Sequence, residues 1–166
     1  KASAKLSVRL IIFVVDFHQK LYLNQPLHHQ QLTRRLSPEQ HQVTQKSATE
    51  APFCGGNLAE KSDGVYACVV CHLPLFRSEH KFDSGTGWPS FFDTSKHENI
   101  KTVRDASFGT VRVEVRCNVC DGHLGHIFTG EGYDTPTDQR YCINGKVLKF
   151  VPKAAAGNGA SKGKDK

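Results

Sequence analysis

The chain has 166 residues, 38% of them hydrophobic, and a formal net charge of +6. Such a chain can bury one ordinary core, and we expect one compact domain with loose ends. The basic excess falls in residues 1–49 and 151–166, whereas residues 50–150 hold slightly more acidic than basic side chains. The central region therefore lacks the charge pattern of a nucleic-acid-binding protein.

Residues 1–35 form a basic leader with one apolar run, Leu10 to Val15, and Asp16 as the only acidic residue. The run is too short to span a bilayer. A basic, acid-poor leader is typical of organellar targeting segments, although these usually hold more Ser and Arg. We expect an intracellular protein, either cytoplasmic with a disordered leader or carried to a mitochondrion or plastid by a targeting segment.

The ordered domain is expected to span residues 36–152 and to begin with a short helix. Ser37 is a capping residue, Pro38 suits the first helical position, and Gln40 completes a capping box. Residues 153–166 are mainly Lys, Ala and Gly without periodicity. That composition predicts a disordered basic tail, to which we assign no function.

From Gly64 onward the apolar residues follow strand patterns. Residues 65–67 lead into a cysteine pair, and Val residues at 111, 113 and 115 alternate with charged residues, a period of two that is typical of a half-buried strand. Apolar segments at 124–128 and 141–150 are separated by a stretch of Gly, Asp, Thr and Pro. The chain is therefore predicted to be mainly β, with antiparallel strands and loops.

Four of the six cysteines form two C-x-x-C pairs, each a tight turn that can direct both sulfurs to one metal ion. We predict a structural Zn²⁺ that joins two distant segments and has no open coordination position, and we predict no organic cofactor. Disulfides, an iron–sulfur cluster and a redox-active C-x-x-C are the alternatives. The predicted ligands are Cys68, Cys71, Cys117 and Cys120.

Zinc binding by these four leaves Cys54 and Cys142, an even remainder that indicates redox chemistry. Cys142 lies in the motif R-Y-C-I-N, preceded along the chain by G-T-G-W-P-S-F at 85–91 and H-L-G-H-I-F at 123–128. With shorter matches at 64–66, 74–76 and 81–84, this ordered set resembles the methionine-R-sulfoxide reductases. The resemblance implies a β-tent fold of two antiparallel sheets with a short N-terminal helix and a zinc site made by the paired C-x-x-C turns.

The resemblance implies that Cys142 is the nucleophile. A thiolate that attacks the sulfoxide sulfur while a proton reaches the oxygen releases methionine and becomes a sulfenic acid. By resemblance, His126 donates the proton and His123 orients and polarises the substrate. Considered alone, an H-x-x-H pattern more often indicates metal binding or exposed side chains. Asn144 is expected either to hydrogen-bond the substrate or to fix the orientation of a histidine.

The resemblance places Trp88, the only Trp in the chain, against the substrate, although a single large aromatic residue is more often core filler. Together with Phe128 it would form an aromatic wall for the methyl group on the sulfoxide sulfur. Arg140 is a further expected substrate contact. The implied substrate is methionine R-sulfoxide, free or in proteins, and the implied role is protein repair under oxidative stress.

Many members of this family hold a resolving cysteine where this chain has Thr86. Cys54 matches an alternative resolving position found in some members, so we expect a Cys54–Cys142 disulfide that thioredoxin reduces. The alternative is that Cys54 is a bystander and an external thiol reduces Cys142 directly. The chain is expected to be a monomer with no membrane span and no nucleic-acid partner.

Two departures from the family pattern lie beside the implied chemistry. His72 stands where the family often has Gly, and a positive φ there would carry a backbone cost. Gly145 and Lys146 stand where small residues usually follow R-Y-C-I-N. Two rival functions are a non-catalytic zinc-ribbon binding module and a redox sensor in which Cys54 locks an oxidised Cys142.

Overall fold

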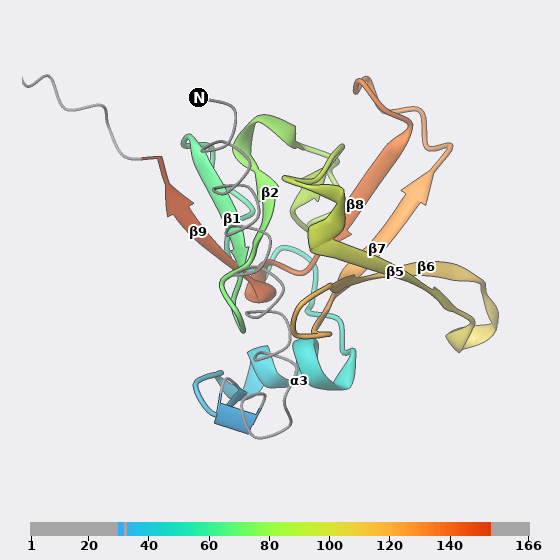
Figure 1. Cartoon of the computed structure of the whole chain (residues 1–166). Coiled ribbons are helices and arrows are strands. Elements are labelled where there is room, and N and C mark those ends of the chain that lie inside the picture. The colour runs from blue at the N-terminus through green and yellow to red at the C-terminus, as the bar shows by residue number, and fades with distance from the viewer. Residues whose placement is uncertain (1–29, 32, 154–166) are drawn as a thin grey trace, which may run out of the picture.

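The computed structural model describes residues 30, 31 and 33–153 (Figure 1). The expected targeting segment and most of the expected basic tail fall in residues 1–29 and 154–166, outside the described residues. Helix α3, Pro38–Lys46, has the predicted capping box: the Ser37 side chain accepts the Gln40 N–H, and the Gln40 side chain accepts the Ser37 N–H. Within the described ranges, none of the helices has the length and apolar character needed to cross a membrane.

Two antiparallel sheets make up the body of the fold, with strand orders β2-β1-β9 and β3-β4-β8-β7-β6-β5. The strands are β1 Gly64–Cys68, β2 Pro74–Arg77, β3 Lys81–Phe82, β4 Ser90–Phe91, β5 Ile100–Asp105, β6 Arg112–Cys117, β7 His123–Thr129, β8 Gln139–Ile143 and β9 Leu148–Pro152. Short 3-10 helices connect them: η1 Ser78–His80, η2 His97–Asn99, η3 Ser107–Gly109 and η4 Gly145–Val147. The prediction of a mainly β fold with a short helix before it is confirmed.

The hydrophobic core lies between the two sheets, which approach each other near helix α3 in Figure 1. Phe76 of the smaller sheet stacks on Phe91 of the larger one with ring centroids 4.5 Å apart, and Tyr66 meets the same ring edge-on at 5.1 Å. Such ring pairs add about 0.5–1.5 kcal/mol each beyond the burial of their area. Val43 of α3 is buried in the same core, so the helix closes it.

Strand β8 carries the expected nucleophile. Tyr141 and Ile143 are buried in the core, so the side chains of Arg140 and Cys142 point to the opposite face of the sheet. After β8, helix η4 turns the chain into β9 of the other sheet. The apolar segment 141–150 therefore forms two strands rather than one. Gly145 permits this turn, since a Cβ there would lie 2.0 Å from the Gly56 carbonyl oxygen.

The predicted alternation at residues 111–115 describes β6 only in part. Val115 is fully buried, but Val111 and Val113 are 62% and 41% exposed. The reason is tertiary, because the β5–β6 hairpin extends away from the smaller sheet in Figure 1. On the other face of β6, the charged residue Glu114 is buried. Its partner is a histidine of the neighbouring strand, described below.

Candidate active site and metal centre

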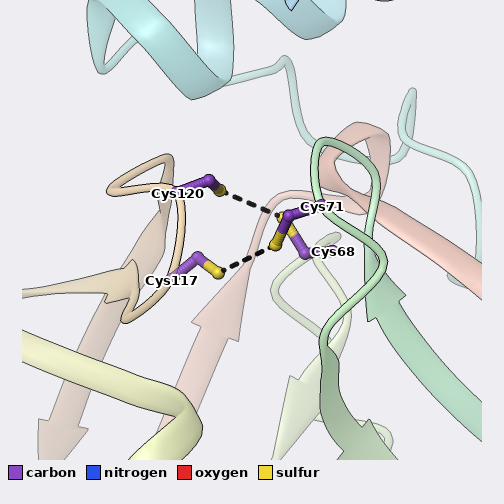
Figure 2. A group of neighbouring side chains, drawn as sticks. All are labelled: Cys68, Cys71, Cys117 and Cys120. Atoms are coloured by element: carbon purple, nitrogen blue, oxygen red, sulfur yellow. Dashed lines mark hydrogen bonds between the residues drawn. The ribbon is translucent and has the colours of Figure 1, made fainter. Parts of the chain in front are cut away.

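The two C-x-x-C pairs come together between the sheets (Figure 2). The sulfur of Cys68 lies 3.6 Å from that of Cys120, and the sulfur of Cys71 lies 3.5 Å from that of Cys117. All four sulfurs lie within 4.8 Å of one another. A tetrahedral ion with Zn–S bonds of about 2.3 Å separates its sulfurs by about 3.8 Å. The predicted ligands therefore form one cluster whose size and donor atoms fit zinc.

Both cysteine pairs make the same turn. The His72 N–H donates to the Cys68 carbonyl at 2.8 Å, and the Asp121 N–H donates to the Cys117 carbonyl at 3.0 Å. His72 and Asp121 have φ values of 61° and 60°, in the left-handed region. A side chain there costs roughly 1 kcal/mol relative to Gly. His72 thus has the positive φ that the sequence analysis considered, and Asp121, at the same place in the second pair, has one too.

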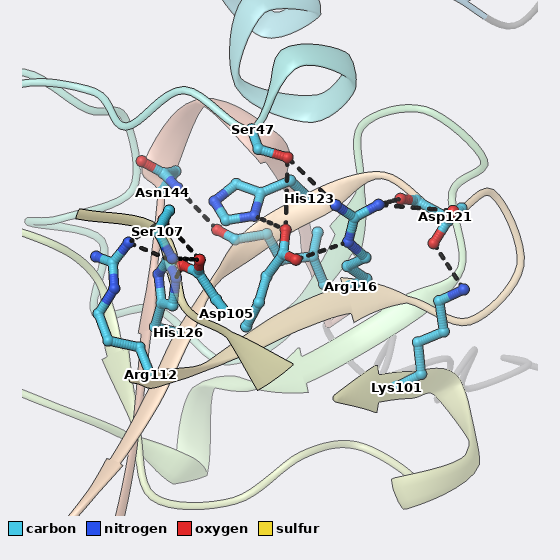
Figure 3. A network of polar contacts seen from close by, with 12 residues as sticks. Ser47, Lys101, Asp105, Ser107, Arg112, Arg116, Asp121, His123, His126 and Asn144 are labelled. Atoms are coloured by element: carbon cyan, nitrogen blue, oxygen red, sulfur yellow. Dashed lines mark hydrogen bonds and ion pairs between the residues drawn. The ribbon is translucent and has the colours of Figure 1, made fainter. Parts of the chain in front are cut away.

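A β-bulge brings the two motif histidines together. His123 and His126 are three residues apart, a spacing that places side chains on opposite faces of a regular strand. The pairing of β7 with β6 skips Leu124, because Val115 pairs with Gly125 whereas Arg116 pairs with His123. Both rings consequently lie on one side of the sheet with centroids 5.5 Å apart (Figure 3).

Asn144 holds the bulged segment in place. Its Nδ2 and its backbone N–H both donate to the Leu124 carbonyl at 2.9 Å. Its Oδ1 accepts the Glu50 N–H at 3.0 Å. Since both ends of the buried amide bind backbone groups, this arrangement favours the expected role of fixing histidine orientation over direct contact with a substrate.

One ring nitrogen of each motif histidine is hydrogen-bonded to a carboxylate (Figure 3). Nε2 of His126 lies 2.8 Å from Oδ2 of Asp105, and Nδ1 of His123 lies 2.5 Å from Oε1 of Glu114. A carboxylate accepts hydrogen bonds, so in neutral rings these nitrogens carry the protons. Nδ1 of His126 and Nε2 of His123 are therefore left for other partners. Nε2 of His123 is buried without a hydrogen bond to any described residue.

The charges of these groups follow from their neighbours. Hydrogen bonds from Ser107 above all, and then from His126, hold the pKa of Asp105 well below its usual range. Burial raises the pKa of Glu114, but hydrogen bonds and ion pairs with basic neighbours outweigh burial and leave that pKa lowered. Burial lowers the pKa of His123, opposed by the adjacent carboxylate. Near pH 7, Asp105 and Glu114 are therefore ionised and His123 is neutral.

Cys142 is half-buried beside several polar groups. In the sheet, Cys142 pairs with His126 of β7 on one side and with Ser90 of β4 on the other. Burial raises the pKa of the Cys142 thiol, whereas the Arg140 charge and hydrogen bonds from Arg140 and Thr86 act in the opposite direction. The thiolate thus depends on these donors, because burial alone favours the neutral thiol.

Arg140 is a fixed cation next to this sulfur. It makes two bonds to the Glu131 carboxylate, at 2.7 and 2.8 Å. Its guanidinium lies 4.7 Å from the centroid of the Phe128 ring and 5.7 Å from that of Tyr133. The bond to Glu131 raises the pKa of Arg140 above its already high ordinary value. Arg140, expected to contact the substrate, therefore lies beside the nucleophile, and Phe128, the other expected contact, lies against Arg140.

Trp88 lies beside a cavity of about 530 Å³, which Phe53 and Phe82 also line. Its Nε1 donates to the Glu50 carbonyl at 3.1 Å. Phe128 is not among the residues that line this cavity. The two residues of the expected aromatic wall thus occupy different surroundings in this structure.

Cys54 is an exposed free thiol in the loop between α3 and β1. The Phe53 N–H donates to the Gly87 carbonyl at 2.8 Å, which holds the loop against residues 85–88. A Cβ on Gly87 would lie only 2.9 Å from the Phe53 ring, so Gly permits this close approach. The loop that carries Cys54 therefore meets the loop that carries Thr86, a hydrogen-bond partner of Cys142.

Sequence reasoning missed three acidic residues that organise the site. Glu114 stands between two valines, and the alternation placed it in solvent. Asp105 ends β5, a strand whose other residues gave no signal. Glu50 is buried near the start of the loop between α3 and β1, where its carboxylate accepts the N–H groups of Gly145 and Lys146 at 2.5 and 2.9 Å. Of the three, only Glu114 gave a signal in the sequence, because it is an acidic residue between two apolar ones.

The SelR domain matches residues 36–152. The chain belongs to the SelR domain family. The match contains both cysteine pairs, the two histidines of β7 and Cys142. Each of these groups therefore lies within the SelR domain.

Several relatives share the name peptide methionine sulfoxide reductase MsrB. The protein from Caulobacter vibrioides (strain NA1000 / CB15N) is 51% identical over 126 residues, which cover 76% of this chain and 78% of that protein. The protein from Synechococcus sp. (strain RCC307) is 49% identical, with 72% and 86% covered. The protein from Escherichia coli (strain K12 / DH10B) is 48% identical, with 74% and 88% covered.

Proposed function

We propose that this protein reduces methionine R-sulfoxide, free or within proteins, to methionine, with Cys142 as the nucleophile. The observation that carries the proposal is a half-buried thiol beside the fixed Arg140 cation, on the strand next to the histidines of β7, in a chain of the SelR domain family. The names of the relatives attribute peptide methionine sulfoxide reduction to those proteins. Protein repair under oxidative stress is the corresponding role.

In the proposed reaction, the Cys142 thiolate attacks the sulfoxide sulfur while one proton is delivered to the sulfoxide oxygen. The oxygen passes to Cys142, which becomes a sulfenic acid as methionine leaves. The cysteine sulfur is oxidised by two electrons and the methionine sulfur is reduced by two. Arg140 supports the thiolate before the attack, because its guanidinium is fixed beside the sulfur.

In this proposal, one histidine of β7 donates the proton and the other orients the substrate. Asp105 accepts from Nε2 of His126, so when both ring nitrogens are protonated the proton on Nδ1 is the one available to the sulfoxide oxygen. His123, neutral and tied to Glu114 through Nδ1, presents Nε2 as an acceptor that can orient the sulfoxide oxygen once that oxygen is protonated. Trp88 and Phe128 are proposed to enclose the methyl group from two sides.

We further propose that the four-cysteine cluster holds Zn²⁺ in a structural role. The cluster offers four sulfurs at separations that match a tetrahedral ion, and no ligand position is left for a substrate. The metal would link the end of β1 to the end of β6 and so join the two sheets.

The test of the proposed function is an assay with the separate R and S epimers of methionine sulfoxide. With dithiothreitol as reductant, we expect methionine from the R epimer and none above background from the S epimer. Quantifying methionine by chromatography checks both outcomes. Failure of folded, zinc-loaded protein on both epimers would favour the redox sensor or the binding module instead, and turnover of the S epimer alone would contradict the assigned stereochemistry.

Cys54 is proposed to resolve the sulfenic acid. Its thiolate would attack the Cys142 sulfur, release water and form a disulfide that thioredoxin or another dithiol then reduces. We expect Cys54→Ser to keep the dithiothreitol-driven rate within about twofold and to lower the thioredoxin-driven rate roughly tenfold or more. Rates with each reductant, and mass spectrometry of the oxidised protein for a Cys54–Cys142 peptide, provide the measurement.

Equal losses with both reductants, or none with either, would argue against Cys54 as the resolving residue and in favour of direct reduction of Cys142 by an external thiol. The monomeric state stays a prediction. So does the compartment, whether cytoplasm, mitochondrion or plastid, because the leader lies largely outside the described residues.

A further inference from the structure

Three hydroxyl groups form a connected chain beside the nucleophile. Ser90, which is fully buried, faces Cys142 across the β4–β8 pairing. Its Oγ lies 2.8 Å from Oγ of Ser84, which lies 2.9 Å from Oγ1 of Thr86. The Thr86 hydroxyl is in turn one of the groups that act to lower the pKa of the Cys142 thiol. We call Ser90, Ser84 and Thr86 the hydroxyl chain.

The loop before β4 is built to hold Thr86 in place. Gly85 and Gly87, on either side of it, have φ values of 69° and 90°, which a residue with a side chain rarely adopts. The Gly85 N–H donates to the Asp83 carboxylate at 2.9 Å, and the Gly87 carbonyl accepts from the neighbouring loop. The Thr86 hydroxyl is therefore positioned before any reaction begins.

The donors and acceptors along the hydroxyl chain allow two complete arrangements. Each hydroxyl has one proton, and the far end of the chain reaches the Trp88 carbonyl, which can only accept, at 3.3 Å from Ser90. When Cys142 is a thiol, every hydrogen bond can point away from the sulfur. The thiol then donates to Thr86, Thr86 donates to Ser84, Ser84 donates to Ser90, and Ser90 donates to the Trp88 carbonyl. When Cys142 is a thiolate, the three hydroxyls reverse and Thr86 donates to the sulfur.

We propose that Thr86 is a catalytic residue that donates a hydrogen bond to the Cys142 thiolate, with Ser84 and Ser90 as positioning residues whose protons reverse when the thiol ionises. The proposal rests on the proposed role of Cys142 as nucleophile. Thr86 occupies the position at which the family resemblance implies a resolving cysteine in many members. In this chain a hydroxyl at that position activates the nucleophile, and resolution falls to another thiol.

The surroundings of Cys142 show why such a donor matters. The charged and titratable groups that face the sulfur are Arg140 on its own strand, Glu131 behind Arg140, and His126 on β7, whereas β4 contributes the uncharged Ser90. Burial works against the thiolate. The hydroxyl chain supplies a second donor to the sulfur from the side of β4, and its members strengthen one another in series.

The experiment measures the pKa of Cys142 from the pH dependence of its alkylation by iodoacetamide in the zinc-loaded protein. Mass spectrometry of the peptide that contains Cys142 separates its signal from the other cysteines. Thr86→Val removes the hydroxyl and keeps the shape, and it should raise the pKa by about one unit or more. Thr86→Ser should restore the original pKa. Ser84→Ala should raise it less, because Ser84 acts through Thr86.

Thr102→Val serves as the matched control, since Thr102 is exposed on the edge strand β5 and should leave the pKa of Cys142 unchanged. A folded Thr86→Val protein with an unchanged pKa overturns the proposal. If that variant does not fold, an unchanged pKa in Ser84→Ala overturns the hydroxyl chain. Alkylation requires no turnover, so a protein inactive on both epimers that still shows these shifts would refute the proposed function and, with it, a catalytic role of Thr86, but would keep the hydrogen bond from Thr86 to the Cys142 thiolate.

Discussion

Replacing Cys142 by Ser is expected to lower reduction of methionine R-sulfoxide by at least about a thousandfold. Serine has nearly the same size, so the strand and its pairing with His126 should persist. Its hydroxyl is far less acidic than a thiol and is a poor nucleophile for sulfur. An oxygen atom in this position also cannot take up the sulfoxide oxygen in the way that a cysteine sulfur does.

The measurement is the initial rate with the R epimer and dithiothreitol, with circular dichroism as the check on folding. Cys54→Ser is the matched control, because it makes the same substitution at the other cysteine outside the metal cluster and should keep most of this rate. Turnover by the Cys142→Ser protein at a rate near that of the wild type would show that another residue is the nucleophile.

Removing the metal is expected to unfold the domain. Structural zinc sites contribute about 10–16 kcal/mol of apparent binding free energy at pH 7, and whole domains are stable by only about 5–15 kcal/mol. The cluster joins the end of β1 in one sheet to the end of β6 in the other. Without an ion, four buried or half-buried thiols are crowded together, with all their sulfurs within 4.8 Å of one another.

Chelation, and separately Cys68→Ser, should therefore abolish the native circular dichroism signal and turnover together. Zinc content by atomic absorption should fall in the same samples. Cys54→Ser, at an exposed position outside the cluster, should keep its zinc and its fold. A zinc-free protein that stays folded and active would show that the core packing of the two sheets suffices without the metal.

The local pattern of the sequence predicted those parts of the fold that depend on neighbours along the chain. The capping box at Ser37 and Gln40 formed as expected, because its two hydrogen bonds join residues three apart. Each C-x-x-C pair forms its own turn, so the four ligands were recognisable from spacing alone. The resemblance of the motifs around Cys142 extended this to the family, which the SelR domain match confirms.

The arrangement of the candidate site was decided by the tertiary structure. The histidines face one side only because β7 bulges at Leu124, an irregularity that no strand pattern encodes. Asp105 and Glu114 reach these rings because β5, β6 and β7 are adjacent.

The sequence by itself determined the mainly β class, the family and the four cysteines that form one cluster, since these depend on residue type and short spacing. Which face each polar side chain takes, and which carboxylate or hydroxyl meets the histidines or Cys142, was decided only in three dimensions. The physical reason is that Thr86, Ser90 and Cys142 lie on segments whose contact depends on strand register and on the packing of two sheets, not on distance along the chain.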